Sequence, residues 1–213
     1  MKGKYPLLSK YVSVGHFVEA LKSPDWYIKL APDQEKLQQV AETLSDSDKH
    51  ALAHEAYRFF EKKLLDKEVA LGNEVGNWDK ERKPIDTIII HHTSSDPGMT
   101  KSFLSAMELI RLYMPYYLNP NDPKDKLVYG KPISSGHVRN GQQVFWPYHW
   151  IIRQNGTAER LLEDSEVGWQ AGNWVINCQS IAITLDNDYS KKVPSDIEIK
   201  AIATIIKENY SGV

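Results

Sequence analysis

The sequence predicts an α/β protein in which helices flank a mixed central β-sheet, with a helical extension at the N-terminus. Three observations carry this prediction. The first 80 residues show helical periodicity, short runs rich in β-branched residues alternate with helical patterns after them, and an Asn-Gly turn joins two of these runs. We therefore expect two parts, a helical extension over residues 1–80 and an α/β domain over residues 81–213.

Three helices are expected in the extension. The strongest spans residues 45–71, where a Ser/Asp cluster suits an N-cap and Leu52 and Phe60 belong to an apolar stripe at four-residue spacing. Weaker patterns cover residues 15–22 and 33–44. A polar segment with two glycines and a proline then reads as a connector.

The second part begins with the run IDTIIIHH (residues 85–92), which predicts a buried strand because three isoleucines follow one another. Residues 100–114 predict a helix that Pro115 ends. A long loop rich in proline and glycine is expected over residues 119–144.

The remaining elements complete the sheet. Residues 148–162 predict a hairpin around Asn155-Gly156, and SIAITLDN (residues 180–187) predicts another strand. The last helix, within residues 194–210, begins at a capping box of Ser195 and Glu198 and carries an apolar stripe of Ile199, Ile202 and Ile206.

Composition narrows the class of protein. The net charge of −2 gives no electrostatic case for binding nucleic acid or an anionic membrane. No apolar run approaches the roughly 20 residues of a membrane-spanning helix. A single cysteine, Cys178, excludes an internal disulfide framework and a cysteine-based zinc cluster. The N-terminus does not read as a cleavable leader; compartment and oligomeric state stay open.

Two histidines end the first strand, where a turn residue would be ordinary. Side chains alternate along a strand, so His91 and His92 should point to opposite faces of the sheet and should not bind one ion together. One imidazole then faces the ligand side, where a rigid strand end suits a first zinc ligand. The alternative is a hydrogen-bonded structural pair.

Five motifs in order carry a resemblance to a known family: IIIHHTS, FWPYHWIIRQNGT, EVGWQAGNWVINC, QSIAITLDN and PSDIEIKAIATIIKENY. Together they resemble the zinc-dependent N-acetylmuramoyl-L-alanine amidases of the type 2 family, whose fold is shared with peptidoglycan recognition proteins. The resemblance covers residues 85–210. It implies hydrolysis, by zinc-activated water, of the amide bond between N-acetylmuramic acid and the L-alanine of the stem peptide, with peptidoglycan or a muropeptide as partner.

The resemblance also implies roles for single residues. His91 matches the first zinc ligand, and Tyr148 matches a tyrosine beside the zinc that stabilises the oxyanion or helps to transfer a proton. The positions that match substrate-contacting or groove-lining residues are His92, Trp169, Gln170, Asn173 and Asn177. Two alternatives stay open: Tyr148 as a core aromatic residue, and Asn177 as a turn residue at a strand entry.

This sequence departs from the family pattern at three places. Gln170 stands where relatives have a histidine, and Thr184 stands where one branch has a glutamate near the metal. The second and third zinc ligands of the family follow the last helix, in a segment that we expect to be missing here, so the zinc site would be incomplete. A site rewired from His91, His137 and Asp186 or Asp188 is a weaker possibility. The rival function is a module that binds muropeptides without hydrolysing them.

Overall fold

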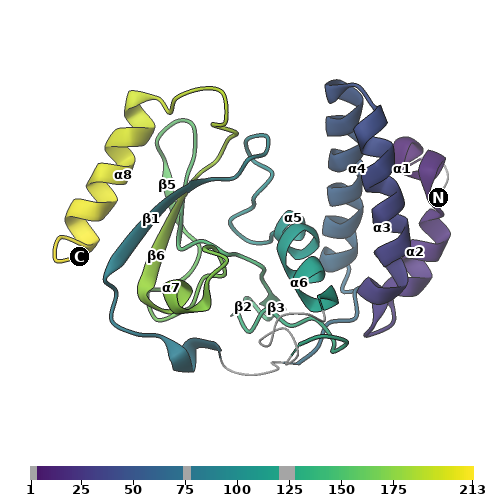
Figure 1. Cartoon of the computed structure of the whole chain (residues 1–213), viewed down its shortest axis with the longest axis horizontal. Helices are drawn as coiled ribbons and strands as arrows, with labels where there is room; N and C mark the ends of the chain where they lie inside the picture. Colours follow the sequence, from purple (N-terminus) through teal and green to yellow (C-terminus); the bar gives the residue numbers. More distant parts are fainter. Residues whose placement is uncertain (1–3, 74–77, 120–127) are drawn as a thin grey trace. The chain divides into compact units, whose positions relative to one another are not determined.

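The computed structural model describes residues 4–73, 78–119 and 128–213. The chain forms two compact units (Figure 1). The first takes in the described residues of Met1–Val75 and Leu109–Ser135, and the second those of Gly76–Glu108 and Gly136–Val213. Parts of the predicted connector and of the predicted loop, residues 74–77 and 120–127, lie outside the described residues.

The first unit is helical, as the sequence predicts. Its helices are α1 (Pro6–Tyr11), α2 (Val14–Leu21), α3 (Trp26–Thr43) and α4 (Asp46–Leu65). The predicted helix over residues 33–44 is only the second part of α3. The helix continues through Pro32 because its first turns bury Trp26, Tyr27 and Leu30, and that packing outweighs the cost of an internal proline.

Aromatic side chains form the core of this unit. Phe59 contacts the rings of Phe17 and Phe60 in edge-to-face geometry, with centroids 5.9 and 5.5 Å apart. The described residues of Leu109–Ser135 belong to the same unit. The hydroxyl of Tyr27 donates to the carbonyl of Lys131 at 2.7 Å, and the Tyr27 ring lies 6.0 Å from that of Tyr117.

The predicted helix over residues 100–114 is wrong in both its bounds. It begins only at Ala106, as α5 (Ala106–Glu108), widens into the π-helical turn η2 (Leu109–Tyr113), and continues as α6 (Met114–Leu118). Pro115 therefore stands in the first turn of α6, where its missing N–H costs little. Phe103, within the predicted helix, lies before α5 and is 54% exposed.

The second unit contains a four-stranded sheet in the order β1-β6-β4-β5. Its strands are β1 (Thr87–His92), β6 (Ser180–Leu185), β4 (Trp150–Ile152) and β5 (Ala158–Arg160). The first two pairings are parallel, while β4 and β5 form the antiparallel hairpin. The mixed sheet flanked by helices that the sequence predicts is thus confirmed.

The strand β1 lies at the edge of this sheet and is not buried, contrary to the prediction. Ile90 is 45% exposed, whereas all six residues of β6 are buried. A run of isoleucines predicts burial on both faces, but an edge strand has a neighbour on one side only. The two histidines at its end consequently lie at the rim of the sheet.

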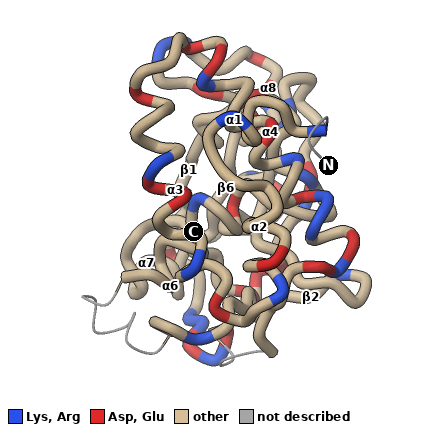
Figure 2. Tube along the Cα trace, turned by 90° about the vertical axis from the view of Figure 1, so that its right-hand side faces the viewer, with Lys and Arg blue, Asp and Glu red and all other residues tan. Residues whose placement is uncertain are grey.

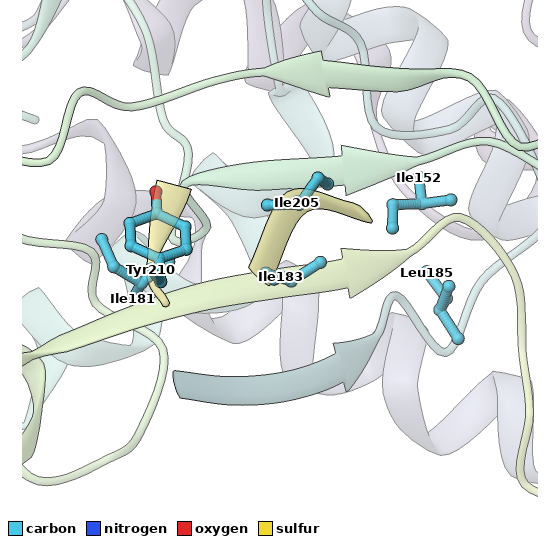
Figure 3. Packing of buried hydrophobic residues seen from close by; sticks show 6 residues of the cluster. All are labelled: Ile152, Ile181, Ile183, Leu185, Ile205 and Tyr210. Atoms are coloured by element: carbon cyan, nitrogen blue, oxygen red, sulfur yellow. The ribbon is translucent and has the colours of Figure 1, made fainter. Parts of the chain in front are cut away.

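The helix α8 (Asp196–Asn209) covers one face of the sheet (Figure 3). Ile205 and Tyr210, which directly follows the helix, pack on Ile181, Ile183 and other residues of β6 and β4. The capping box is present, because the Glu198 carboxylate accepts from the backbone N–H of Ser195 at 2.9 Å. The predicted stripe is partly wrong: the helix turns Ile205 to the sheet and leaves Ile199 50% exposed.

Short elements surround the sheet. They are the 3₁₀-helix η1 (Trp78–Glu81), the hairpin strands β2 (Val138–Arg139) and β3 (Gln142–Gln143), and the helix α7 (Trp174–Gln179). Acidic and basic residues are interspersed along the chain (Figure 2). No helix in the described residues is both long and apolar enough to cross a membrane.

Candidate functional site

The strand β1 positions His91 on the face of the sheet opposite to α8. Its register partner in β6 is Thr184, which is fully buried. The imidazole of His91 lies beside the ring of Tyr148, with centroids 5.5 Å apart and planes inclined at 43°. Tyr148 lies two residues before β4 and packs partly against the small core of Val144 and Ile151. The structure thus brings together the two residues to which the sequence assigns the chemistry.

The loop that precedes α7 brings a third residue to this pair. The side-chain oxygen of Gln170 is hydrogen-bonded to Nε2 of His91. The Gln170 amide nitrogen donates to the hydroxyl of Ser180 at 2.8 Å. Gln170 therefore links the end of β1 to the beginning of β6.

Burial determines the charge state of His91. Desolvation lowers the pKa of its imidazole, and the neighbouring His92 acts in the same direction, while the hydrogen bond to Gln170 opposes them. The net shift is downward, so the ring is neutral at pH 7. A neutral imidazole has one lone pair for a metal ion or a hydrogen-bond donor.

The neighbouring histidine, His92, contacts a different part of the chain. Nδ1 of His92 accepts from the backbone N–H of Tyr189 at 3.0 Å, and it lies 3.6 Å from the carboxylate of Asp188. These contacts belong to the segment after β6 and not to the surroundings of His91. His91 and His92 therefore point to opposite faces, as strand alternation predicts.

Three tryptophans gather next to Gln170. Trp169 is 7% exposed, and its ring lies 5.4 Å from that of Trp78 and 6.4 Å from that of Trp174, all in edge-to-face geometry. The indole N–H of Trp174 donates to the carboxylate of Glu81 at 2.6 Å. Trp169 is thus the buried member of an aromatic cluster to which the segment before β1 also contributes.

The two asparagines hold this loop in shape. Asn173 is the N-cap of α7, and its side chain accepts from the backbone N–H of Ile176 at 3.2 Å. The side-chain oxygen of Asn177, a residue that is 6% exposed, accepts from the backbone N–H groups of Gln170 and Ala171 at 3.2 and 2.8 Å. Asn177 lies inside α7, so its reading as a turn residue at a strand entry is wrong; it positions the backbone that carries Gln170.

The described residues do not assemble the rewired metal site. His137 is buried, not on a surface loop, and its Nε2 lies 3.3 Å from the carboxylate of Asp79. Asp186 accepts from the guanidinium of Arg153 at 2.8 Å and from the backbone N–H of Gly98 at 2.9 Å. Both candidate ligands are thus engaged in structural pairs.

The side chains available as ligands decide whether a zinc site can form. A catalytic zinc ion needs three protein ligands. Across residues 4–73, 78–119 and 128–213, no three side chains of His, Cys, Asp or Glu come together as a metal site. His91 suits a single ligand, but the described residues do not complete the site.

Sequence reasoning missed two residues that build this region. His149 is fully buried, donates from Nε2 to the carbonyl of Glu166 at 2.9 Å, and accepts at Nδ1 from the N–H of Ala182 at 3.1 Å. Arg82 donates to three backbone carbonyls, including those of Asn177 at 3.0 Å and Ser180 at 2.9 Å. The only local signal was the presence of a histidine inside an apolar strand and an arginine in a polar connector, and neither reveals a distant partner.

Comparisons with known proteins add independent information. The family model described as N-acetylmuramoyl-L-alanine amidase matches residues 81–211, which is more than half of the chain. No curated protein and no solved structure matched. The matched range includes His91, Tyr148 and the loop that carries Gln170.

Proposed function

The chain belongs to the N-acetylmuramoyl-L-alanine amidase family, and from this premise we propose which bond it cleaves and with which residues. As a member it is a peptidoglycan amidase. The proposed reaction is hydrolysis of the amide bond between the lactyl group of N-acetylmuramic acid and the L-alanine of the stem peptide.

The observation that carries this proposal is the contact between His91 and Tyr148. Amide hydrolysis develops negative charge on the carbonyl oxygen, and a phenol beside the reacting group stabilises that charge by donating a hydrogen bond. The Tyr148 ring lies 5.5 Å from the His91 ring. In the proposal Tyr148 donates to the developing oxyanion, while His91 supplies a neutral lone pair next to it.

The tryptophans next to this pair support a glycopeptide substrate. Trp78, Trp169 and Trp174 cluster beside the loop of Gln170, and aromatic faces pack well against the apolar faces of sugar rings. We propose that Trp169 and the asparagines of the loop contribute to substrate binding directly or through the backbone they hold. His92 points to the opposite face of the sheet, so the proposal assigns it no contact with the substrate. The muramyl group would then lie along the loop, with the scissile amide toward His91.

Zinc is part of the proposal as a cofactor. When bound, it would supply a water of lowered pKa and polarise the amide carbonyl. His91 would be one ligand. Since the described residues gather no second and third ligand around it, the role proposed for Tyr148 does not depend on the metal.

The incomplete set of metal ligands among the described residues favours a second candidate function. A member of this fold that lacks a three-ligand metal site would hold muropeptides without hydrolysing them. Tyr148, Gln170 and the tryptophans would then be recognition residues.

Digestion of purified cell walls separates the two functions. The chain is incubated with walls, with and without added Zn²⁺, and new α-amino groups of L-alanine are quantified beside the amount of protein that sediments with the walls. Hydrolysis releases stem peptides whose N-terminal L-alanine has a free α-amino group. His91→Ala should abolish this release. Co-sedimentation without release at any Zn²⁺ concentration would support the binding module instead.

A further inference from the structure

Both the side chain and the backbone of Gln170 are held by hydrogen bonds. Its amide nitrogen donates to Ser180 Oγ at 2.8 Å, and Ser180 is fully buried at the start of β6. The backbone N–H of Gln170 and that of Ala171 both donate to the Asn177 side chain. The amide thus faces His91 with its oxygen, in an orientation set by Ser180 on a backbone that Asn177 holds.

This orientation has a consequence for the His91 ring. The oxygen of an amide only accepts hydrogen bonds, so the ring nitrogen that meets it, Nε2, must be the protonated one. A neutral imidazole carries one N–H. The lone pair of His91 therefore resides on Nδ1.

We infer that Gln170 is a positioning residue that locks His91 in the Nε2–H tautomer and presents Nδ1 as the nitrogen that binds a ligand. Hydrogen bonds of this kind, from the second nitrogen of a histidine to an oxygen acceptor, set which nitrogen reacts and how the ring is oriented. Glutamine adds no charge to the site, and both ends of its amide are already bonded within the protein. Its bearing on hydrolysis rests on the proposed function, whereas the tautomer does not.

A second histidine, His149, serves as an internal reference for this tautomer. His149 donates from Nε2 to a backbone carbonyl and accepts at Nδ1 from a backbone N–H, so its tautomer is also Nε2–H. Burial lowers the pKa of His149 to about 4, so the ring is neutral at pH 7. No atom of Gln170 takes part in these two hydrogen bonds.

The test is long-range ¹H–¹⁵N NMR of histidine rings in the full chain at pH 7. This spectrum distinguishes a protonated from an unprotonated ring nitrogen. We expect His91 and His149 to show the same Nε2–H pattern. A pattern for His91 with the proton on Nδ1 would overturn the inference, because it would mean that the Gln170 amide donates to the ring.

Two variants separate positioning from a general structural effect. In Gln170→Leu the acceptor is lost, so His91 should lose its single pattern and show both tautomers, while His149 keeps its signals and reports that the fold is intact. Gln170→Glu keeps an oxygen acceptor and should restore the Nε2–H pattern. Because a carboxylate beside the ring raises the pKa of His91, the spectrum of this variant is recorded at alkaline pH, where the ring is neutral. If His91 kept one unchanged pattern in Gln170→Leu, Gln170 would not be the determinant. Wall digestion by the unsubstituted chain tests the proposed function separately, so the two can fail independently.

Discussion

In the proposed reaction the phenol of Tyr148 stabilises the transition state by donating a hydrogen bond, and a substitution can test this role. We expect Tyr148→Phe to keep the ring beside His91 and to remove only the hydrogen-bond donor. The rate of stem-peptide release should then fall by about 100-fold, because a lost oxyanion donor acts on turnover. The affinity for the muropeptide, measured by calorimetry, should change little.

The matched control is Tyr129→Phe in the helical unit, where the ring is 47% exposed. It makes the same chemical change away from the site and should leave both quantities unaltered. Equal losses of turnover and affinity in Tyr148→Phe would instead assign Tyr148 to substrate binding.

His149 makes the stability of the chain depend on pH. Burial lowers its pKa from 6.5 to about 4, so the unfolded chain binds a proton more readily than the folded chain between these values. The contribution is complete above pH 6.5 and is lost as pH falls toward 4. Urea unfolding should show a decrease on the order of 3 kcal/mol over this window.

Much of this decrease, between pH 6.5 and 5, lies above the range where ordinary carboxylates titrate. An NMR titration should also find His149 neutral until the pH approaches 4. A ring that takes up its proton near pH 6.5 in the folded chain would contradict the assignment.

For single residues, the sequence predicts the structure correctly where the governing rule is local. Alternation along β1 predicts that His91 and His92 diverge, and the contacts with Gln170 and Tyr189 confirm it. The partner of His91 is 79 residues away in the sequence. No local pattern reports such a contact, since the path of the loop before α7 decides it.

Among the elements, the loop before α7 depends on one close approach to the segment that precedes β4. A Cβ atom on Gly168 would collide with the carbonyl oxygen of Pro147 and lie 3.2 Å from the ring of His149. We expect Gly168→Ala to displace the loop and lower the free energy of unfolding by about 2–4 kcal/mol, since backbone cannot yield as a side chain can. Urea unfolding measures this loss.

The control is another glycine-to-alanine change with open space around it. Gly15 lies in α2, its nearest contact would be 3.8 Å away, and alanine is the better helix former. Gly15→Ala should therefore be neutral or stabilising. Comparable destabilisation by both variants would show that the approach of Gly168 to Pro147 has no special cost.

Turn chemistry was the most reliable signal for elements. Asn155-Gly156 predicts the hairpin of β4 and β5, and it is found, with Gly156 at a φ of 80°. The same dipeptide at Asn140-Gly141 joins β2 and β3, with both residues at positive φ. That hairpin was hidden within a segment whose prolines and glycines predict a loop, because its strands are only two residues long.

For the whole molecule, the order of strands and helices sufficed to predict the class of fold, because each pattern reflects burial of one face. It did not suffice to predict which segments share a core. Residues 109–135 follow the first strand in the sequence, yet their described part packs with the N-terminal helices. The expected division at residue 80 therefore remains a prediction that truncation can test.

We expect a fragment of residues 81–213 to fold poorly. In the whole chain, Tyr117 packs on Tyr27, the carbonyl of Lys131 accepts from the Tyr27 hydroxyl, and the carbonyl of Ile133 accepts from the N–H of Gly72 at 2.8 Å. Removing the N-terminal helices would expose the apolar surface that these contacts cover, which promotes association. Size-exclusion chromatography and hydrogen exchange should show aggregation or rapid exchange in residues 109–119 and 128–135. Adding residues 1–80 as a separate chain should restore protection there, whereas a monomeric fragment with full protection would establish residues 81–213 as a domain that folds independently.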